Sequence, residues 1–447
     1  MGYRLKKIMV WIGIGLVAFI AVGLVVRAIF NYTNGKKLEK FLTQMKSEGI
    51  PLTLKDIEPE CNPRENAALI WKTAEAMFSL ERENRTFLGK VIGDFFEGRP
   101  LSEEEKQRSH DLMAENQDII RLILDASTKP CFKYEEQWEI PGYNLKIAKA
   151  ISMIQSTRLL GIDAVIKAEE GHVEEAVNQC LAARRFLQLY LQEPSLITYL
   201  VATACMKQVA VCFNKIVTER EIETDMLKRI LREWDCSPWR EGLVRSLEAE
   251  RIIRIETSLL YLKGDYEVTF DLGGKFYYWV FRPVYKSEII WLMGSYDLVK
   301  KAAGMPYYAS RDSEELERRM NSTPWYYKMA GLLLPNAVAV LFKRATLEAM
   351  FETARVGIAC KIYKNMHGDF PEDLSELAPE ILEEVPVDPF TGNSLIYSKQ
   401  DSGIIIYSIG SNLKDDGGNG TWQITSLVMD KDDDWAWKET PGKRQGK

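Results

Sequence analysis

The stretch "SIGSNLKDDGGNG" (408–420) brings together the residue types that a hard cation requires. Two adjacent carboxylates, Asp415 and Asp416, lie among glycines and asparagines, directly after the apolar run "GIIIY" (403–407). Cations such as calcium take six to eight oxygen ligands, and glycines allow backbone carbonyls to turn toward an ion. The same composition also suits a plain turn, because glycine and asparagine accept positive φ and aspartate caps its own backbone. The residues alone leave both interpretations open.

Elsewhere the chain offers little material for catalysis. It has three histidines and contains no G-x-S-x-G, H-E-x-x-H or P-loop motif. Carboxylates at helical spacing, such as Glu248 and Glu250 beside Arg251, could do acid–base chemistry, but alternating signs are more typical of a solvated, salt-bridged helix face. We therefore predict a protein that is not an enzyme.

The cysteines are also interpreted as structural. Seven are dispersed along the chain without a C-x-x-C pair, which indicates buried small hydrophobes rather than a zinc site or a disulfide framework. Cys205 and Cys212 share one helical face with apolar neighbours, and no cluster of positive charge beside them would lower a thiol pKa. We expect both to be core residues.

Length and charge restrict the class of protein further. The 447 residues suggest two or three domains, and 46% hydrophobic with 27% charged residues is a globular composition. A net charge of −6 without a concentrated basic surface argues against a nucleic-acid partner.

The N-terminus predicts a membrane anchor, residues 1–30. The uncharged run 8–26 matches the ~20 residues that cross a bilayer core as a helix, and no cleavage pattern follows it. We expect it to be retained as a single-pass signal-anchor whose partner is the lipid bilayer. Basic residues on both sides nearly balance, but the short basic N-terminus favours the cytoplasm. The bulk of the chain would then be extracytoplasmic, whereas the unpaired cysteines weakly favour the opposite orientation.

A predicted linker (31–65) leads to an α-helical domain (66–343). Ser102 and Glu105 have the spacing of a capping box, which starts a helix. The segments 145–170 and 173–191 predict a helical hairpin around Gly171. The apolar stretch 329–342 is short for a membrane span, so we expect a buried helix.

An aromatic-rich insert at about 261–310 interrupts this pattern. It contains "GKFYYWVFRPVYKSEIIWLMGSY". Such a segment can be a binding face or a surface that rests on the membrane interface, where amphipathic rings are stable. We favour the alternative, a long connection whose aromatic rings fill the helical core, because large aromatic side chains dominate core burial.

The C-terminal module (344–447) has the most specific pattern. A helix is predicted over 344–366, and Gly368 followed by Pro371 is a helix stop. Two short strands joined by a "KQDSG" hairpin loop precede the glycine–aspartate loop. The whole chain is therefore predicted to be mainly α, with an N-terminal transmembrane helix, an irregular multi-helix domain and a small α+β module that combines a helix with a short antiparallel sheet.

The order of motifs in this module resembles the globular domain of type II secretion major pseudopilins. The matching residues are Tyr363-Lys364, the turn Gly368–Pro371, the turn Asp388–Gly392, Ser408-Ile409-Gly410 and the loop Lys414–Gly420. The resemblance covers about the last 100 residues, and its motifs are specific only in combination. The whole chain also resembles membrane-anchored proteins of planctomycete-type bacteria, which implies the bacterial inner (cytoplasmic) membrane with a periplasmic domain.

The pseudopilin resemblance implies a calcium site. In that family the loop binds calcium through backbone carbonyls and acidic side chains, which the final segment brings together. Carried over, the ligands would be Asp415 and Asp416, with one of Asp430, Asp432 or Asp433 completing the shell. Asn412 stands where the family often has aspartate, and no pilin-type processing site precedes the anchor.

These observations predict a membrane-anchored cell-envelope protein of interaction or structural type, with an envelope protein as partner and a calcium-stabilised C-terminal module. One alternative is a metal-dependent hydrolase that uses the aspartate cluster with an open coordination position. Another is a cytoplasm-facing membrane scaffold.

Overall fold

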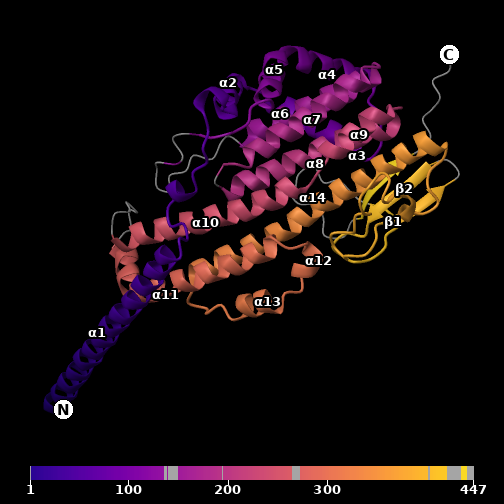
Figure 1. The fold of residues 1–447 in the computed structure, drawn as a ribbon. Helices are drawn as coiled ribbons and strands as arrows, with labels where there is room; N and C mark the ends of the chain where they lie inside the picture. The colour runs from indigo at the N-terminus through magenta and orange to yellow at the C-terminus, as the bar shows by residue number, and fades with distance from the viewer. Residues whose placement is uncertain are drawn as a thin grey trace.

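The computed structural model describes residues 2–134, 138, 150–193, 195–263, 272–400, 403–419 and 434–439. Within these residues the protein is mainly helical, with one small antiparallel sheet near its C-terminal end (Figure 1). The predicted fold class is confirmed. The helices form one elongated body, from which α1 (Gly2–Ser47) projects as a shaft.

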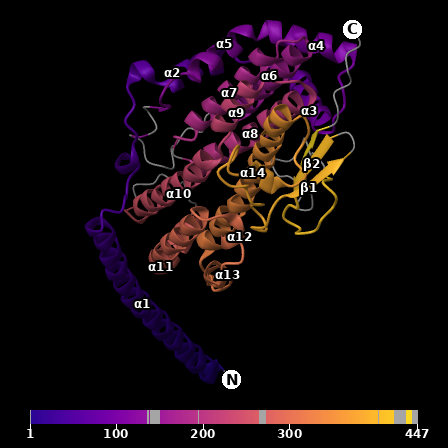
Figure 2. The same cartoon turned by 45° about the vertical axis from the view of Figure 1, so that its right-hand side comes forward.

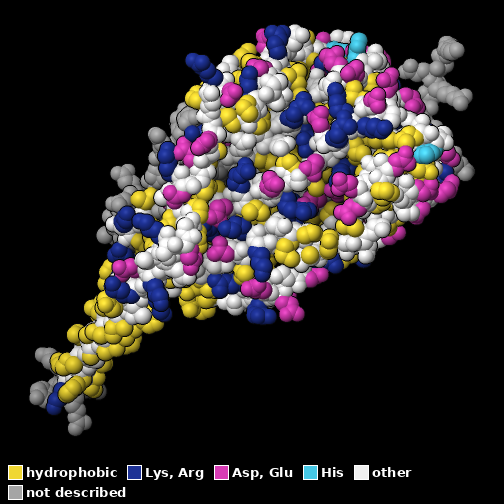
Figure 3. All heavy atoms as spheres, in the orientation of Figure 1, with side chains coloured by type: hydrophobic (Ala, Val, Ile, Leu, Met, Phe, Trp, Pro, Cys, Tyr) yellow, Lys and Arg dark blue, Asp and Glu magenta, His cyan; other side chains and the backbone are white. Residues whose placement is uncertain are grey.

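Helix α1 has two parts with opposite surroundings. Side chains 7–26 are all exposed and form an apolar shaft outside the charged body (Figure 3). The later residues Leu38 and Met45 are buried in the main core, and α1 packs along α11. The predicted linker 31–65 is therefore helical up to Ser47, and only two short 3₁₀ turns, Leu54–Ile57 and Pro63–Glu65, follow it.

The first part of the body confirms two local predictions. Ser102 and Glu105 form the capping box: each backbone N–H donates to the other's side chain, at 3.2 and 2.9 Å. The helical hairpin is also present, and Gly171 between its helices has φ +94°. The helices here are α2 (Ala67–Met77), α3 (Arg82–Phe96), α4 (Glu103–Glu115), α5 (Gln117–Ala126), α6 (Ala150–Glu169), α7 (Val173–Tyr190), α8 (Leu196–Glu219) and α9 (Thr224–Glu233).

Helix α8 lies at the centre of this part and contacts α3, α6 and α7. Gly161 of α6 permits the closest approach, because a Cβ atom there would come within 2.7 Å of the Cys212 sulfur. Cys205 and Cys212 are fully buried, as predicted, and burial raises the pKa of the Cys205 thiol to about 12.

The aromatic-rich insert differs from its prediction. From Leu272 to Ala303 it forms one helix, α11, with Pro283 inside it, rather than a connection. Tyr296 is buried, but Trp279 and Phe281 are exposed, so the aromatic residues fill the core only in part. Helix α11 follows α10 (Ser237–Lys263) and precedes α12 (Tyr307–Ser310) and α13 (Glu314–Asn321).

Helix α14 (Lys328–His367) connects the body to the C-terminal module and begins well before the predicted residue 344. It ends at Gly368, whose φ of +89° gives the predicted left-handed stop. The predicted hairpin is formed by β1 (Ile396–Gln400) and β2 (Gly403–Ser408), and β3 (Trp435–Glu439) pairs antiparallel with β2. The rotated view in Figure 2 shows the sheet beside the end of α14.

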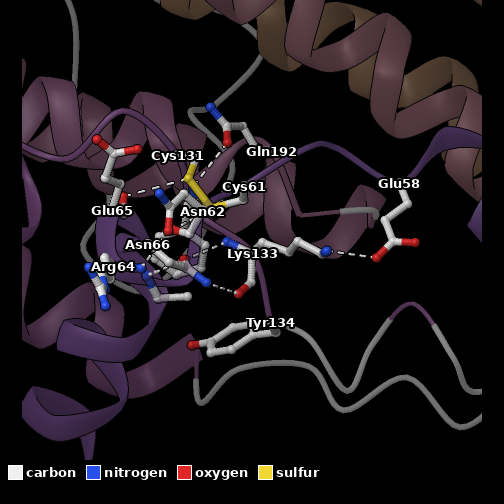
Figure 4. Close-up of a disulfide and its surroundings, with 12 residues drawn as sticks. Glu58, Cys61, Asn62, Arg64, Glu65, Asn66, Cys131, Lys133, Tyr134 and Gln192 are labelled. Atoms are coloured by element: carbon white, nitrogen blue, oxygen red, sulfur yellow. Dashed lines mark hydrogen bonds and ion pairs between the residues drawn. A yellow bond between two sulfur atoms is a disulfide. The ribbon is translucent and has the colours of Figure 1, made fainter.

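The expectation that all cysteines are unpaired is wrong for two of them. Cys61 and Cys131 form a disulfide, with Cα atoms 5.8 Å apart and a sequence separation of 70. Asn66 holds this arrangement: its side chain donates to the Lys133 carbonyl at 2.7 Å and accepts from the Lys133 N–H (Figure 4). Because tertiary contacts create the pairing, sequence spacing could not reveal it. The other five cysteines are buried thiols.

Candidate functional site

The glycine–aspartate loop is positioned by the three-stranded sheet. It leaves β2 at Ser408, and β3 returns so that Trp435 lies opposite Ser408 in the strand register. The loop turns sharply, since Gly410, Gly417 and Gly418 have φ between +64° and +73°. Asp434 and the start of β3 therefore lie beside the loop.

The two predicted carboxylates of the loop are held by donors from the loop and from β2. Asp415 accepts hydrogen bonds from the Tyr407 hydroxyl at 2.8 Å and from the Gly417 N–H at 2.9 Å. Asp416 accepts one from the Asn412 amide at 2.8 Å. Burial and the Asp415 carboxylate raise the pKa of Tyr407 to about 12, so this hydroxyl remains a donor at neutral pH.

Asp434 is an acidic residue of this site that the sequence analysis missed. Its Oδ2 accepts from the backbone N–H groups of Asp416 at 3.0 Å and Gly418 at 2.8 Å. The side chain is 1% exposed, and its Oδ1 is buried without a hydrogen-bond partner. Burial, together with Asp416 and Asp415, raises its pKa above the ordinary range. A buried carboxylate oxygen without a partner is costly unless a proton or a cation meets it.

The other predicted ligands, Asp430, Asp432 and Asp433, lie outside the described residues. Among the residues that the structure does describe, no group of three or more His, Cys, Asp or Glu side chains is arranged to hold a metal ion. Of the predicted ligand set, the structure describes the adjacent Asp415 and Asp416, and the Asp434 carboxylate is hydrogen-bonded to the same loop.

Two of the motifs that carry the resemblance meet in space. The buried Asp388 carboxylate accepts from the Ser408 hydroxyl at 2.9 Å and from the Ile409 N–H at 3.1 Å. It also accepts from the Phe390 N–H at 2.8 Å within its own turn. This single side chain ties the Asp388–Gly392 turn to the start of the glycine–aspartate loop.

A cleft of about 680 Å³ lies where the body meets the module. The Cys236 thiol donates to Glu352 at 3.1 Å, and Arg240 pairs with the buried Glu348 at 3.0 Å. Burial raises the Cys236 pKa well above its ordinary value and also raises that of Glu352. A protonated thiol is a poor nucleophile, so these surroundings do not activate Cys236.

The carboxylates considered for acid–base chemistry are ion-paired, as predicted, but are less solvated than expected. Glu248 contacts Arg251 and Lys300, and Glu250 contacts Arg254. Arg251 is fully buried. The Glu248–Lys300 pair joins α10 to α11, and the other two pairs lie within α10.

Comparison of the chain with protein-family models, with curated proteins and with solved structures gives no match.

Proposed function

We propose that this chain is a single-pass membrane-anchored protein of the bacterial cell envelope. Its helical body and C-terminal module lie on the extracytoplasmic side of the cytoplasmic membrane and bind another envelope protein rather than catalyse a reaction. A calcium ion at the glycine–aspartate loop stabilises the module.

The Cys61–Cys131 disulfide is the main support for an extracytoplasmic body. Disulfides persist in oxidising compartments and are rare in the cytosol. This one lies in the body, on the C-terminal side of an apolar helix segment whose side chains are exposed. The disulfide favours a body outside the cytoplasm. The short basic N-terminus favours the same orientation, with the N-terminus in the cytoplasm.

Asp434 supports the calcium component of the proposal. Its unpartnered, buried Oδ1 belongs to a carboxylate that already contacts the loop bearing Asp415 and Asp416. A divalent cation would neutralise these charges and use that oxygen, and an ion that binds only the folded state adds stability by mass action.

The orientation is tested by counting thiols in the full-length chain. Cells that express it are lysed directly into denaturant with a polyethylene-glycol maleimide, with and without prior reduction. With the body outside, five thiols react before reduction, corresponding to the free cysteines, and the two of the disulfide react only after it. Cys61→Ser should give one additional reactive thiol, from Cys131, without reduction. If all seven react before reduction, the body faces the cytoplasm as a scaffold.

Calcium is tested by thermal unfolding of the detergent-solubilised full chain in calcium and in chelator. We expect calcium to raise the unfolding temperature of the wild type but not of the Asp415→Ala/Asp416→Ala variant. Glu383→Ala/Glu384→Ala is the matched control, because it removes two adjacent exposed carboxylates from the same module. Equal unfolding of the wild type with calcium and with chelator would leave the loop as a hydrogen-bonded turn.

A further inference from the structure

Four exposed apolar side chains lie close together at the start of α14 and in the turn before it. Trp325 is 80% exposed and Leu332 is 64% exposed, and Tyr326 and Met329 are exposed as well. We name these four residues the α14 edge. Large apolar groups gathered on a charged body mark a surface that another apolar phase covers.

The α14 edge is held firmly in place by buried neighbours. On the opposite face of the same helix, Ala330 and Leu334 are buried in the core. The Ala330 N–H donates to the buried Glu288 carboxylate of α11 at 2.8 Å, which caps the start of α14. Trp291 of α11 packs edge-on against Tyr327 with ring centroids 6.0 Å apart. The edge is therefore a built surface rather than a frayed helix end.

The contacts of α11 indicate where the α14 edge lies relative to the membrane-spanning part of α1. Arg27, which closes the apolar run of α1, donates to the Trp279 carbonyl at 2.6 Å and lies over the Trp279 ring. Further along, Asn34 donates to the Pro283 carbonyl at 2.8 Å. The two helices thus run side by side away from the bilayer, and Glu288 is about 14 Å beyond Trp279 at 1.5 Å per residue.

Helix α14 runs in the same direction as α11. Its start is at Glu288, and further along Arg344 donates to the carbonyls of Ala303 and Met305. The α14 edge therefore occupies the end of α14 that is nearer to the bilayer. In Figures 1 and 2 the edge of the body formed by α11 and α13 is the one nearest the shaft, and α2, α4 and α5 lie on the opposite edge.

A moderate tilt of α1 brings the edge to the lipid. Packed helices lie 8–10 Å apart, so α14, beyond α11, is roughly 20 Å to the side of α1. A tilt of about 30° is within the range of membrane helices and lowers that side by about 10 Å. This closes most of the ~14 Å between the edge and the level of Arg27, and the headgroup layer spans the remainder.

We propose that the α14 edge rests in the headgroup region of the same bilayer that α1 spans, as a second lipid contact. Tryptophan and tyrosine favour this layer because one part of each ring system is apolar and another is polar. Lys328, between Tyr326 and Met329, is exposed, with its Nζ 5.5 Å from the Trp325 ring centroid. Its ammonium group can reach lipid phosphates while its stem covers the rings.

The test measures lipid contact at one edge residue in the full-length chain. Leu332→Cys is labelled with an environment-sensitive nitrobenzoxadiazole maleimide and reconstituted in vesicles of phosphatidylcholine and phosphatidylglycerol. Leu69→Cys is the matched control, because Leu69 is also an exposed leucine (47%) but lies on α2 at the opposite edge. The wild type gives the background, since its free cysteines are buried. Trp325→Cys replaces Leu332→Cys if that variant does not fold.

We expect headgroup spin-labelled lipids to quench the label at 332 strongly and the label at 69 weakly, with aqueous iodide giving the reverse order. Equal quenching at both positions by iodide, with none by the lipid probe, would overturn the proposal. Protection of position 332 from both quenchers would also overturn it, because a protein, such as a second copy of the chain, would then cover the edge.

Discussion

Helices α8 and α14 are alike in composition but differ in their surroundings. Each contains an 18-residue stretch apolar enough to cross a membrane, but 83% of that stretch is buried in α8 and 50% in α14. Contacts with α3, α6, α7 and α14 surround α8, whereas Met329 and Leu332 of α14 are exposed. Apolar composition dictates that a helix avoids water, but the topology determines whether protein or lipid replaces the water.

The largest difference in unfolding free energy is expected between substitutions on the two faces of α14. Leu334→Ala removes a leucine that is 1% exposed and should lower the free energy of unfolding by about 3 kcal/mol, because the cavity cannot close fully. Leu332→Ala, two residues earlier, should change it by less than about 0.5 kcal/mol in detergent. Denaturant titration of the solubilised full chain measures both. A similar loss for both variants would mean that the two faces are equally buried.

A smaller effect is expected from glycines in the two halves of α14. A Cβ atom at Gly357 would overlap the indole ring of Trp437, whereas at Gly331 it would meet nothing within 4 Å. Gly357→Ala should therefore cost about 2 kcal/mol through overpacking, and Gly331→Ala should be neutral or stabilising by up to about 1 kcal/mol. If Gly357→Ala also leaves the unfolding midpoint unchanged, β3 does not pack against α14 as described.

The lysines of α14 should show the same contrast more weakly. The buried Lys361 donates to the Val217 carbonyl at 2.7 Å and to the Arg220 carbonyl at 3.2 Å, at the end of α8. Lys361→Met should cost about 2 kcal/mol, because these carbonyls lose a charged donor. Lys328→Met, at an exposed position, should change the unfolding free energy by less than about 0.5 kcal/mol. Denaturant titration of both variants measures the two losses, and a larger loss for Lys328→Met than for Lys361→Met would contradict the prediction.

The smallest effect on the unfolding free energy is expected in α4, a polar helix whose outer face is in contact with water. The Lys90 ion pair and the Ser102 N–H lower the pKa of Glu105 from 4.5 to about 2. Since the folded state has the lower pKa, this stability is complete above about pH 5 and is lost as the pH falls through 2. Solvent screening reduces it to about 1 kcal/mol. Glu105→Gln should flatten the acid side of the stability–pH curve, and the exposed Glu104→Gln should not.

Local features of the fold could be predicted because the residues that determine them are neighbours in sequence. The capping box of Ser102 and Glu105 and the helix stop at Gly368 depend on a few adjacent residues. Helix α14 joins two helices that were predicted separately, the apolar stretch 329–342 and the helix over 344–366. Pro335 is tolerated inside it because this residue lies on the exposed face of the helix, so its missing N–H does not interrupt a buried turn.

Features formed by distant segments could not be predicted in the same way. Cys61 and Cys131 are brought together by contacts between distant segments, among them the hydrogen bonds between Asn66 and Lys133, and no spacing rule encodes these contacts. Asp434 was missed because the strand after it was not predicted, although the alternation in "WAW" (435–437) was a usable signal: both tryptophans are buried. Asp415 and Asp416 could be predicted from the composition of the loop, but predicting the buried Asp434 would have required predicting β3.

The continuity of α1 has a mechanical consequence. Its 46 residues form one helix that passes from the apolar shaft into the core at Leu38 and Met45, with no flexible joint between them. The body therefore follows the tilt of the shaft as one unit, and it can rotate about the bilayer normal and diffuse in the plane of the membrane. A partner anchored in the same membrane would meet it as in a two-dimensional encounter, with little orientational entropy left to lose on binding.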